Sequence, residues 1–188
     1  MRVFNLVVSL ILMALSTTAM SAVPRPYALT PSTDSLYVAS AGEVILTFLS
    51  KTASYSSDLY LQGTEDSILN NQKVTPGTQF SLGSFQAGAE LAFTIFVKTT
   101  GFAYYTGDEN KNPDKFIHSA FDITSGQSVN VGFEDIFNGG DRDYDDLVFS
   151  LNNVVVGKLP VTPVPEPQTY VLLLAGLLML GAVKRRKS

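Results

Sequence analysis

The side chains with the clearest chemical potential lie in one segment, residues 131–149. It holds six carboxylates, and Arg142 is the only basic residue among them. Crowded carboxylates raise one another's pKa values unless a cation lies between them. Ca²⁺ takes six to eight oxygen ligands, which alternating acidic residues on a tight Gly-containing loop can supply. We therefore predict a site for Ca²⁺ or a similar hard cation in an acidic loop of residues 134–146. The predicted ligands are Glu134, Asp135, Asp141, Asp143 and Asp145.

Other interpretations of this loop stay open at this stage. It can be a plain strand connection, with an Arg142 salt bridge and carboxylates that cap backbone N–H groups. It can also carry a catalytic carboxylate pair, for example Glu134 and Asp143. An EF-hand is excluded, because Asp146 stands where the loop needs Gly and Asn152 stands where it needs Glu. The aromatic residues Phe133, Tyr144 and Phe149 are expected to pack beneath the loop.

The rest of the chain offers little catalytic chemistry. His118 is the only histidine and no cysteine is present, so thiolate sites are excluded and a Ser-His-Asp triad has a single possible base. No nucleophile motif surrounds His118, and we expect a structural or surface histidine. The acidic residues 107–114 are interpreted as a solvated loop, with a contribution to the ion site as the alternative. We predict that the protein is not an enzyme.

The N-terminus has the organisation of a secretory signal peptide. Arg2 precedes an apolar run at residues 6–15, and small residues follow up to Ala22. We assign residues 1–22 to this signal, with an uncleaved anchor as the alternative.

The C-terminus combines a Pro-rich spacer with an apolar segment. Residues 161–188 contain Pro165-Glu166-Pro167, an apolar run at 169–183 and a basic end at 184–187. As a helix this run measures about 22 Å, shorter than a bilayer core of about 30 Å. The basic end is expected to stay cytoplasmic, which places the preceding domain outside.

This tail resembles a PEP-CTERM sorting signal. The resemblance implies recognition by an exosortase, a membrane protease-transpeptidase of Gram-negative bacteria. It further implies anchoring in the inner membrane during sorting, removal of the tail, and delivery to the cell surface or an exopolysaccharide (biofilm) matrix. A permanent single-span anchor is the alternative.

Residues 23–160 have the patterning of a β-domain. Apolar residues alternate with other residues in 44–49, 91–97 and 129–133, and β-branched or aromatic runs occupy 147–151 and 154–156. Turn signals separate these runs, which favours an all-β, antiparallel β-sandwich, jelly-roll-like, with a single C-terminal hydrophobic helix outside it. Residues 66–71 are compatible with a short helix or a loop.

The acidic segment also resembles the signature of a bacterial extracellular family, the domain of unknown function 4114. Its Gly-Phe-Glu-Asp corresponds to residues 132–135, its Gly-Gly-Asp-x-Asp pattern to residues 139–143, and its apolar strand to residues 147–149. Asp146 departs from the pattern, where Asn is expected to be common. Since the family's biochemistry is undefined, the resemblance implies fold and location rather than activity.

Charge completes the functional interpretation. Residues 23–165 carry 8 basic and 16 acidic side chains, which disfavours nucleic acid and anionic surfaces. The sequence predicts an exported, non-enzymatic cell-surface or matrix protein with a Ca²⁺-stabilised loop and extracellular polysaccharide as a candidate partner. The main alternative is a carbohydrate-binding module that uses Tyr104, Tyr105 and Tyr144. A glycan-processing enzyme is a further alternative.

Overall fold

The computed structural model describes residues 27–123 and 128–157. The predicted signal peptide, the Pro165-Glu166-Pro167 motif and the apolar run 169–183 lie outside these ranges, as do the outer ends of the predicted domain 23–160. Within them, the chain forms strands and two short 3-10 helices, and it contains no α-helix. The strands are β1 (Thr30–Pro31), β2 (Leu36–Val38), β3 (Gly42–Ser50), β4 (Ser57–Leu61), β5 (Leu69–Asn70), β6 (Gln79–Phe85), β7 (Glu90–Leu91), β8 (Phe93–Val97), β9 (Phe102–Tyr105), β10 (Ser119–Ile123), β11 (Ser128–Phe133), β12 (Leu147–Asn152) and β13 (Val154–Val156). The 3-10 helices are η1 (Glu109–Lys111) and η2 (Phe137–Gly139).

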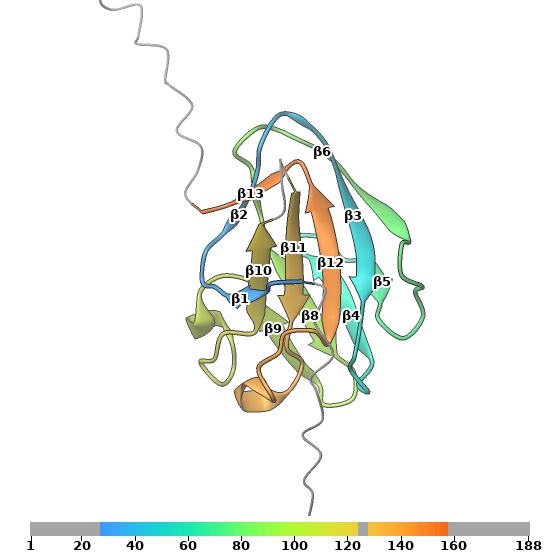
Figure 1. Ribbon diagram of the computed structural model, residues 1–188, viewed down its shortest axis with the longest axis vertical. Helices are drawn as coiled ribbons and strands as arrows, with labels where there is room; N and C mark the ends of the chain where they lie inside the picture. Colours follow the sequence, from blue (N-terminus) through green and yellow to red (C-terminus); the bar gives the residue numbers. More distant parts are fainter. Residues whose placement is uncertain (1–26, 124–127, 158–188) are drawn as a thin grey trace, which may run out of the picture.

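The described strands form three sheets. Their orders are β1-β10-β11-β12-β3-β6, β13-β2-β7 and β5-β4-β8-β9. Every strand pair is antiparallel, so the all-β, antiparallel prediction is confirmed. Figure 1 shows β10, β11 and β12 side by side, with strands of the four-stranded sheet behind them. None of the helices in the described ranges has the length and apolar character needed to cross a bilayer.

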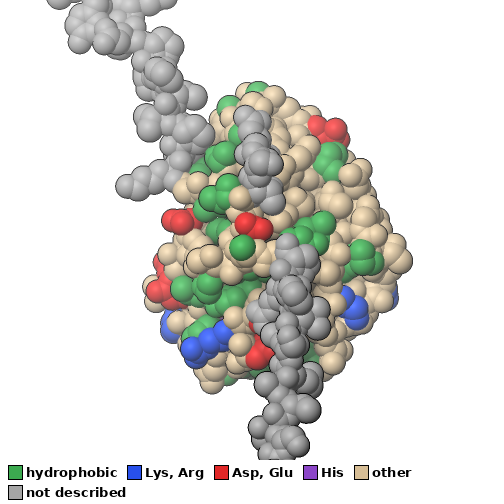
Figure 2. Space-filling view, viewed as in Figure 1, with side chains coloured by type: hydrophobic (Ala, Val, Ile, Leu, Met, Phe, Trp, Pro, Cys, Tyr) green, Lys and Arg blue, Asp and Glu red, His purple; other side chains and the backbone are tan. Residues whose placement is uncertain are grey.

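The core follows the period-2 pattern of the sequence. In β3, the side chains of Val44, Leu46 and Phe48 are fully buried, while the residues between them are only partly buried. Phe93 of β8 and Phe149 of β12 meet with ring centroids 5.2 Å apart, which joins the four-stranded and six-stranded sheets through one core cluster. On the face shown in Figure 2, hydrophobic side chains lie in small groups separated by other surface.

Two local expectations need adjustment. Residues 66–71, interpreted as a helix or a loop, contain the short strand β5, whose Leu69 pairs with Leu59 of β4. The apolar run at 91–97 is divided into β7 and β8, which belong to different sheets. Pairing partners distant in sequence decided both cases, and local periodicity carries no information about them.

The strand register brings the polar segments to one end of the six-stranded sheet. Ser119 of β10 is opposite Phe133 of β11, and Phe133 is opposite Leu147 of β12. His118, the residues after Phe133 and the residues before Leu147 therefore lie together. Gly132 permits the close approach of the Tyr144 backbone to β11, because a Cβ at Gly132 would lie 2.2 Å from the carbonyl oxygen of Tyr144. In Figure 1 the β11–β12 connection, with η2, lies at the lower end of the molecule.

Candidate metal centre

Three carboxylates converge in the β11–β12 connection. Glu134, Asp141 and Asp143 each offer an oxygen, and these oxygens all lie within 4.8 Å of one another. Glu134 follows β11 directly, while Asp141 and Asp143 come after the turn at η2. Oxygen atoms at this spacing can surround one hard cation.

Glu134 is the most unusual member of this group. Its side chain is fully buried, and neither carboxylate oxygen has a hydrogen-bond partner in the described part of the chain. Burial, followed by the close approach of the Asp146 carboxyl group and then the charges of Asp146, Asp141 and Asp143, raises the pKa of Glu134 to about 9. A buried carboxylate without donors has a large desolvation cost, which protonation or a bound cation would remove.

Gly140 makes room for this carboxylate. A Cβ at Gly140 would lie 2.3 Å from Oε1 of Glu134, and its φ of +41° is one that L side chains rarely adopt. Gly139 is similarly enclosed, because a Cβ there would lie 2.2 Å from the ring of Phe116. Glycine is therefore required at both positions, because the neighbouring side chains leave no room for a Cβ and because both residues have a positive φ.

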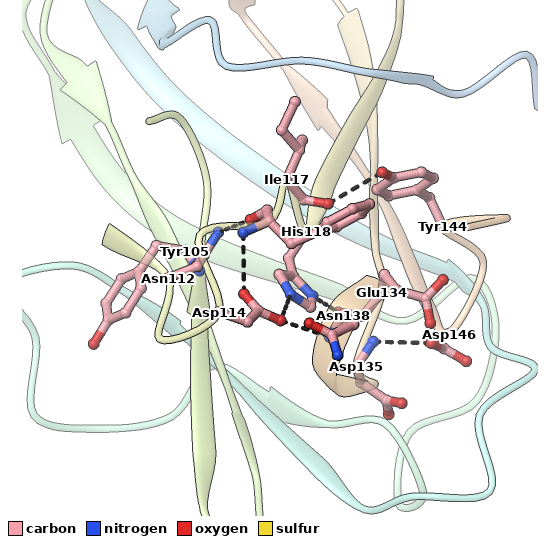
Figure 3. Close-up of polar contacts among 11 residues, drawn as sticks. Tyr105, Asn112, Asp114, Ile117, His118, Glu134, Asp135, Asn138, Tyr144 and Asp146 are labelled. Carbon is pink, nitrogen blue, oxygen red and sulfur yellow. Dashed lines mark hydrogen bonds and ion pairs between the residues drawn. The ribbon is translucent and has the colours of Figure 1, made fainter. Parts of the chain in front are cut away.

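Asp135 and Asp146 form a second pair beside this group. The backbone N–H of Asp135 donates to Oδ2 of Asp146 over 2.9 Å, and the Ser57 hydroxyl donates to Oδ2 of Asp135 over 3.1 Å. Burial and the Asp146 charge raise the pKa of Asp135 to about 7, although the Ser57 hydrogen bond opposes the shift. Figure 3 shows the Glu134, Asp135 and Asp146 side chains close to one another.

Asp145 connects the loop to the β3–β4 segment. Its carboxylate accepts a hydrogen bond from the Thr52 hydroxyl, and its carbonyl accepts one from the Thr52 backbone N–H over 3.0 Å. The Asp145 backbone N–H lies 3.3 Å from Oδ1 of Asp143 and donates to it. Burial and the Asp145 carboxylate raise the pKa of Asp143 to about 6. Asp145 thus has partners inside the protein.

A second buried polar cluster supports the loop from below. The His118 ring is fully buried, with Nδ1 2.8 Å from the Glu134 carbonyl oxygen and Nε2 2.9 Å from Oδ2 of Asp114. Asp114 also accepts hydrogen bonds from the backbone N–H groups of Asn138 (2.7 Å) and Phe116 (3.1 Å). Burial alone would raise the pKa of Asp114, but the hydrogen bonds from His118 and these two amides lower it. Figure 3 shows the chain of contacts from Asn138 through Asp114 and His118 to Glu134.

Aromatic packing holds this second cluster in place. The Tyr104 ring stacks on His118 with a centroid separation of 3.7 Å, and the Tyr144 hydroxyl donates to the Ile117 carbonyl over 3.1 Å. Phe133, Tyr144 and Phe149 are all buried, as the sequence predicted. The Arg142 guanidinium lies 4.7 Å from the Phe116 ring centroid, which is a cation–π contact.

The acidic loop borders a cavity of about 700 Å³. Residues 52–55 form one wall, and Asp135, Ile136, Asp141 and Asp143 contribute to the other. The side-chain amide of Gln72 donates to the carbonyls of Ala53 and Tyr55, which holds the first wall in place. Three of the predicted carboxylates, Asp135, Asp141 and Asp143, therefore line a space large enough for a small ligand.

The structure brings together only part of the predicted ligand set. Glu134, Asp141 and Asp143 converge, whereas Asp135 and Asp145 use their carboxylates in hydrogen bonds to Ser57 and Thr52. Asp146, which was not among the predicted ligands, lies next to Glu134 and lowers its tendency to ionise.

Other sequence expectations are revised here. His118 is a structural histidine, but residues 107–114 are not wholly solvated, because the Asp114 side chain is fully buried against His118. Tyr104 and Tyr144 are buried and cannot stack on a sugar, while Tyr105 is half-buried. The spacing of Asp114 and His118, four residues apart before a strand, was the only sequence signal for their pairing.

Comparison with known proteins gives two family matches along the chain. Residues 55–153 match the family described as Domain of unknown function (DUF4114), and the chain belongs to this family. Residues 163–187 match the PEP-CTERM protein-sorting motif, which identifies an exported protein that is processed at the membrane by an exosortase. No curated protein and no solved structure matches the chain.

Proposed function

We propose that the protein is a non-enzymatic component of the cell surface or exopolysaccharide matrix, with an acidic loop stabilised by Ca²⁺. The observation that carries the proposal is the Glu134 carboxylate, which is fully buried, has no hydrogen-bond partner among residues 27–123 and 128–157, and faces Asp141 and Asp143. A divalent cation among these oxygens would supply the missing electrostatic partner.

The plain strand connection accounts for only part of the loop. Asp145 and Asp146 accept hydrogen bonds from Thr52 and from the Asp135 backbone, as a structural turn requires. Glu134 does not fit that interpretation. A buried carboxylate without a partner destabilises the folded state, and an apolar side chain at the same position would not. We therefore favour the cation site.

Display outside the cytoplasm agrees with the sorting motif at residues 163–187. In our proposal a β-sandwich domain, jelly-roll-like, spans residues 23–160 between the signal peptide and the tail. The apolar helix at 169–183 would anchor the chain in the inner membrane of a Gram-negative bacterium while the exosortase acts. Release or retention at the surface would then place the acidic domain among extracellular polysaccharides.

A carboxylate-based glycosidase is the less favoured function. The pair considered for it, Glu134 and Asp143, would have to approach a glycosidic bond from two sides. Glu134 lies beneath the backbone of Gly140, and its oxygen is within 4.8 Å of one from Asp143. This arrangement supports shared coordination of one ion better than acid–base catalysis on a polymer.

Calorimetric titration of the full chain with Ca²⁺, paired with thermal melts in Ca²⁺ and in chelator, tests the proposal. We expect saturable binding and a melting temperature that rises with the logarithm of ion concentration. Asp143→Asn should abolish both effects, while Glu65→Gln, an exposed acid distant from the loop in sequence, should leave them intact. Absence of heat and of any thermal shift at millimolar Ca²⁺ would refute the ion site.

A further inference from the structure

The cavity beside the acidic loop has features of a ligand site that the ion alone does not explain. It has a volume of about 700 Å³, within the range of small-molecule sites. Two of the three converging carboxylates, Asp141 and Asp143, line one side, and residues 52–55 face them from the β3–β4 segment. The Thr52 hydrogen bonds to Asp145 and the Gln72 bonds to Ala53 and Tyr55 hold both walls in place.

The three carboxylates can leave some coordination positions of the ion open to another ligand. Glu134, Asp141 and Asp143 supply at most six oxygens if every carboxylate is bidentate, whereas Ca²⁺ takes six to eight. Glu134 approaches from the buried side, beneath Gly140. Asp141 is exposed and Asp143 half-buried at the cavity, so any remaining coordination positions face the open side.

The negative charge of the residues at the cavity favours one class of ligand over another. Asp135, Asp141, Asp143 and Asp146 line this end of the cavity, and the buried Glu134 lies next to Asp141 and Asp143, whereas one divalent cation balances only two negative charges. A carboxylated or sulfated ligand would meet residual negative potential. A neutral ligand with adjacent hydroxyl groups can coordinate the ion without that cost.

The wall opposite the carboxylates has an apolar part. Tyr55 is the only aromatic residue that lines the cavity, and Ile136, which is 43 % exposed, lies at the other side. An aromatic ring beside a set of oxygen ligands suits a pyranose, which has an apolar face and a hydroxylated edge.

We propose that the bound Ca²⁺ is also a recognition element, and that the cavity binds a neutral glycan through adjacent hydroxyl groups on the ion and contact with Tyr55. This inference rests on the proposed ion site, because without the cation the carboxylates have no means of holding a neutral sugar. It differs from the sequence-based sugar hypothesis in its residues, since Tyr104 and Tyr144 are buried.

Tyrosine fluorescence of the full chain provides the assay, since the protein has 8 Tyr and no Trp. The chain is kept in a detergent without a sugar headgroup and is titrated with mannotetraose, cellotetraose and tetragalacturonate, each with Ca²⁺ and with chelator. We expect saturable binding of at least one neutral tetrasaccharide in Ca²⁺, a loss of at least tenfold in affinity with chelator, and no binding of the uronate.

Variants on the wall opposite the carboxylates separate recognition from ion binding. Tyr55→Ala should lower sugar affinity at least tenfold, whereas the matched Tyr55→Phe keeps the ring and should retain it within about threefold. Ser54→Leu, at an exposed position lining the cavity, should also weaken binding, with Ser54→Ala as its control. All four variants should bind Ca²⁺ like the wild type in calorimetry.

Each outcome has a defined meaning. Loss of Ca²⁺ binding in the wild type overturns the proposed function together with this inference. Normal Ca²⁺ binding with no response to either neutral tetrasaccharide overturns the inference alone. Equal sugar binding with Ca²⁺ and with chelator, or tighter binding of the uronate, also overturns it, because the ion would not then be the recognition element.

Discussion

Two buried polar clusters meet at Glu134, and they differ in how their charges are balanced. Below the loop, the Asp114 carboxylate has His118 and two backbone N–H groups as partners. On the other side, the Glu134 carboxylate has no hydrogen-bond donor within the described part of the chain and faces further carboxylates. The opposite shifts of their pKa values, lowered for Asp114 and raised for Glu134, express this contrast. The first cluster is complete within the chain, whereas the second requires a proton or a cation from solution.

The largest effect is expected for the complete cluster. Asp114→Asn removes the charge that His118 faces and should cost about 3 kcal/mol or more of unfolding free energy, with and without Ca²⁺. Urea denaturation in both conditions measures it. Asp108→Asn is the control, because Asp108 is exposed and Asn caps a helix as well as Asp does. A loss below about 1 kcal/mol for Asp114→Asn would show that the pair is not important for stability.

An opposite response is expected for the incomplete cluster. Wild-type protein should gain about 2.7 kcal/mol when free Ca²⁺ is one hundred times its dissociation constant. Glu134→Gln should abolish this gain while leaving the Ca²⁺-free stability unchanged or higher, since the amide can donate to the neighbouring carboxylates. The same denaturation series provides the test. Retention of the Ca²⁺ gain in Glu134→Gln would remove Glu134 from the site.

Gly140 links backbone geometry to the ion site. Gly140→Ala places a Cβ against the Glu134 carboxylate at a positive φ, and should cost about 1–2 kcal/mol in addition to weakening Ca²⁺ binding. Gly101→Ala also has a positive φ, but its Cβ would meet open space. It should therefore show a strain cost without a change in calorimetric Ca²⁺ affinity. Equal Ca²⁺ affinities for the two variants would argue against a close fit at Gly140.

The last expected effect is a pH dependence of stability whose sign depends on whether the ion is bound. In the Ca²⁺-free protein, the raised pKa values of Glu134, Asp135 and Asp143, at about 9, 7 and 6, mean that the folded state holds more protons than the unfolded chain. The contribution of these three groups to stability should be greatest below about pH 4 and fall as pH rises toward 9. Saturating Ca²⁺ binds the ionised groups, so stability should then rise over the same range. Parallel curves in chelator and Ca²⁺ would contradict ion binding by these carboxylates.

Much of the fold could be predicted from the sequence, because side-chain burial in a strand follows the local alternation of apolar residues. The alternation in residues 44–49 predicted which side chains of β3 enter the core, and the aromatic run at 147–151 predicted β12. The division of residues 91–97 between two sheets was not predictable, because it depends on pairing with β2 and β4. Which of the predicted carboxylates converge was not predictable for a similar reason, since Asp145 is engaged by Thr52, a residue 93 positions away.

By itself, the sequence determined the sorting motif, the all-β character and the acidic segment, because composition, spacing and periodicity are local properties. Tertiary structure decided which carboxylates converge, that Glu134 is buried with no donor from the described residues, and that Asp114 and His118 support the loop from below. It also decided that residues 52–55 face the acidic loop across a cavity. The physical reason is that burial and electrostatic balance depend on neighbours brought together by strand register, and register is set by the whole sheet rather than by any one segment.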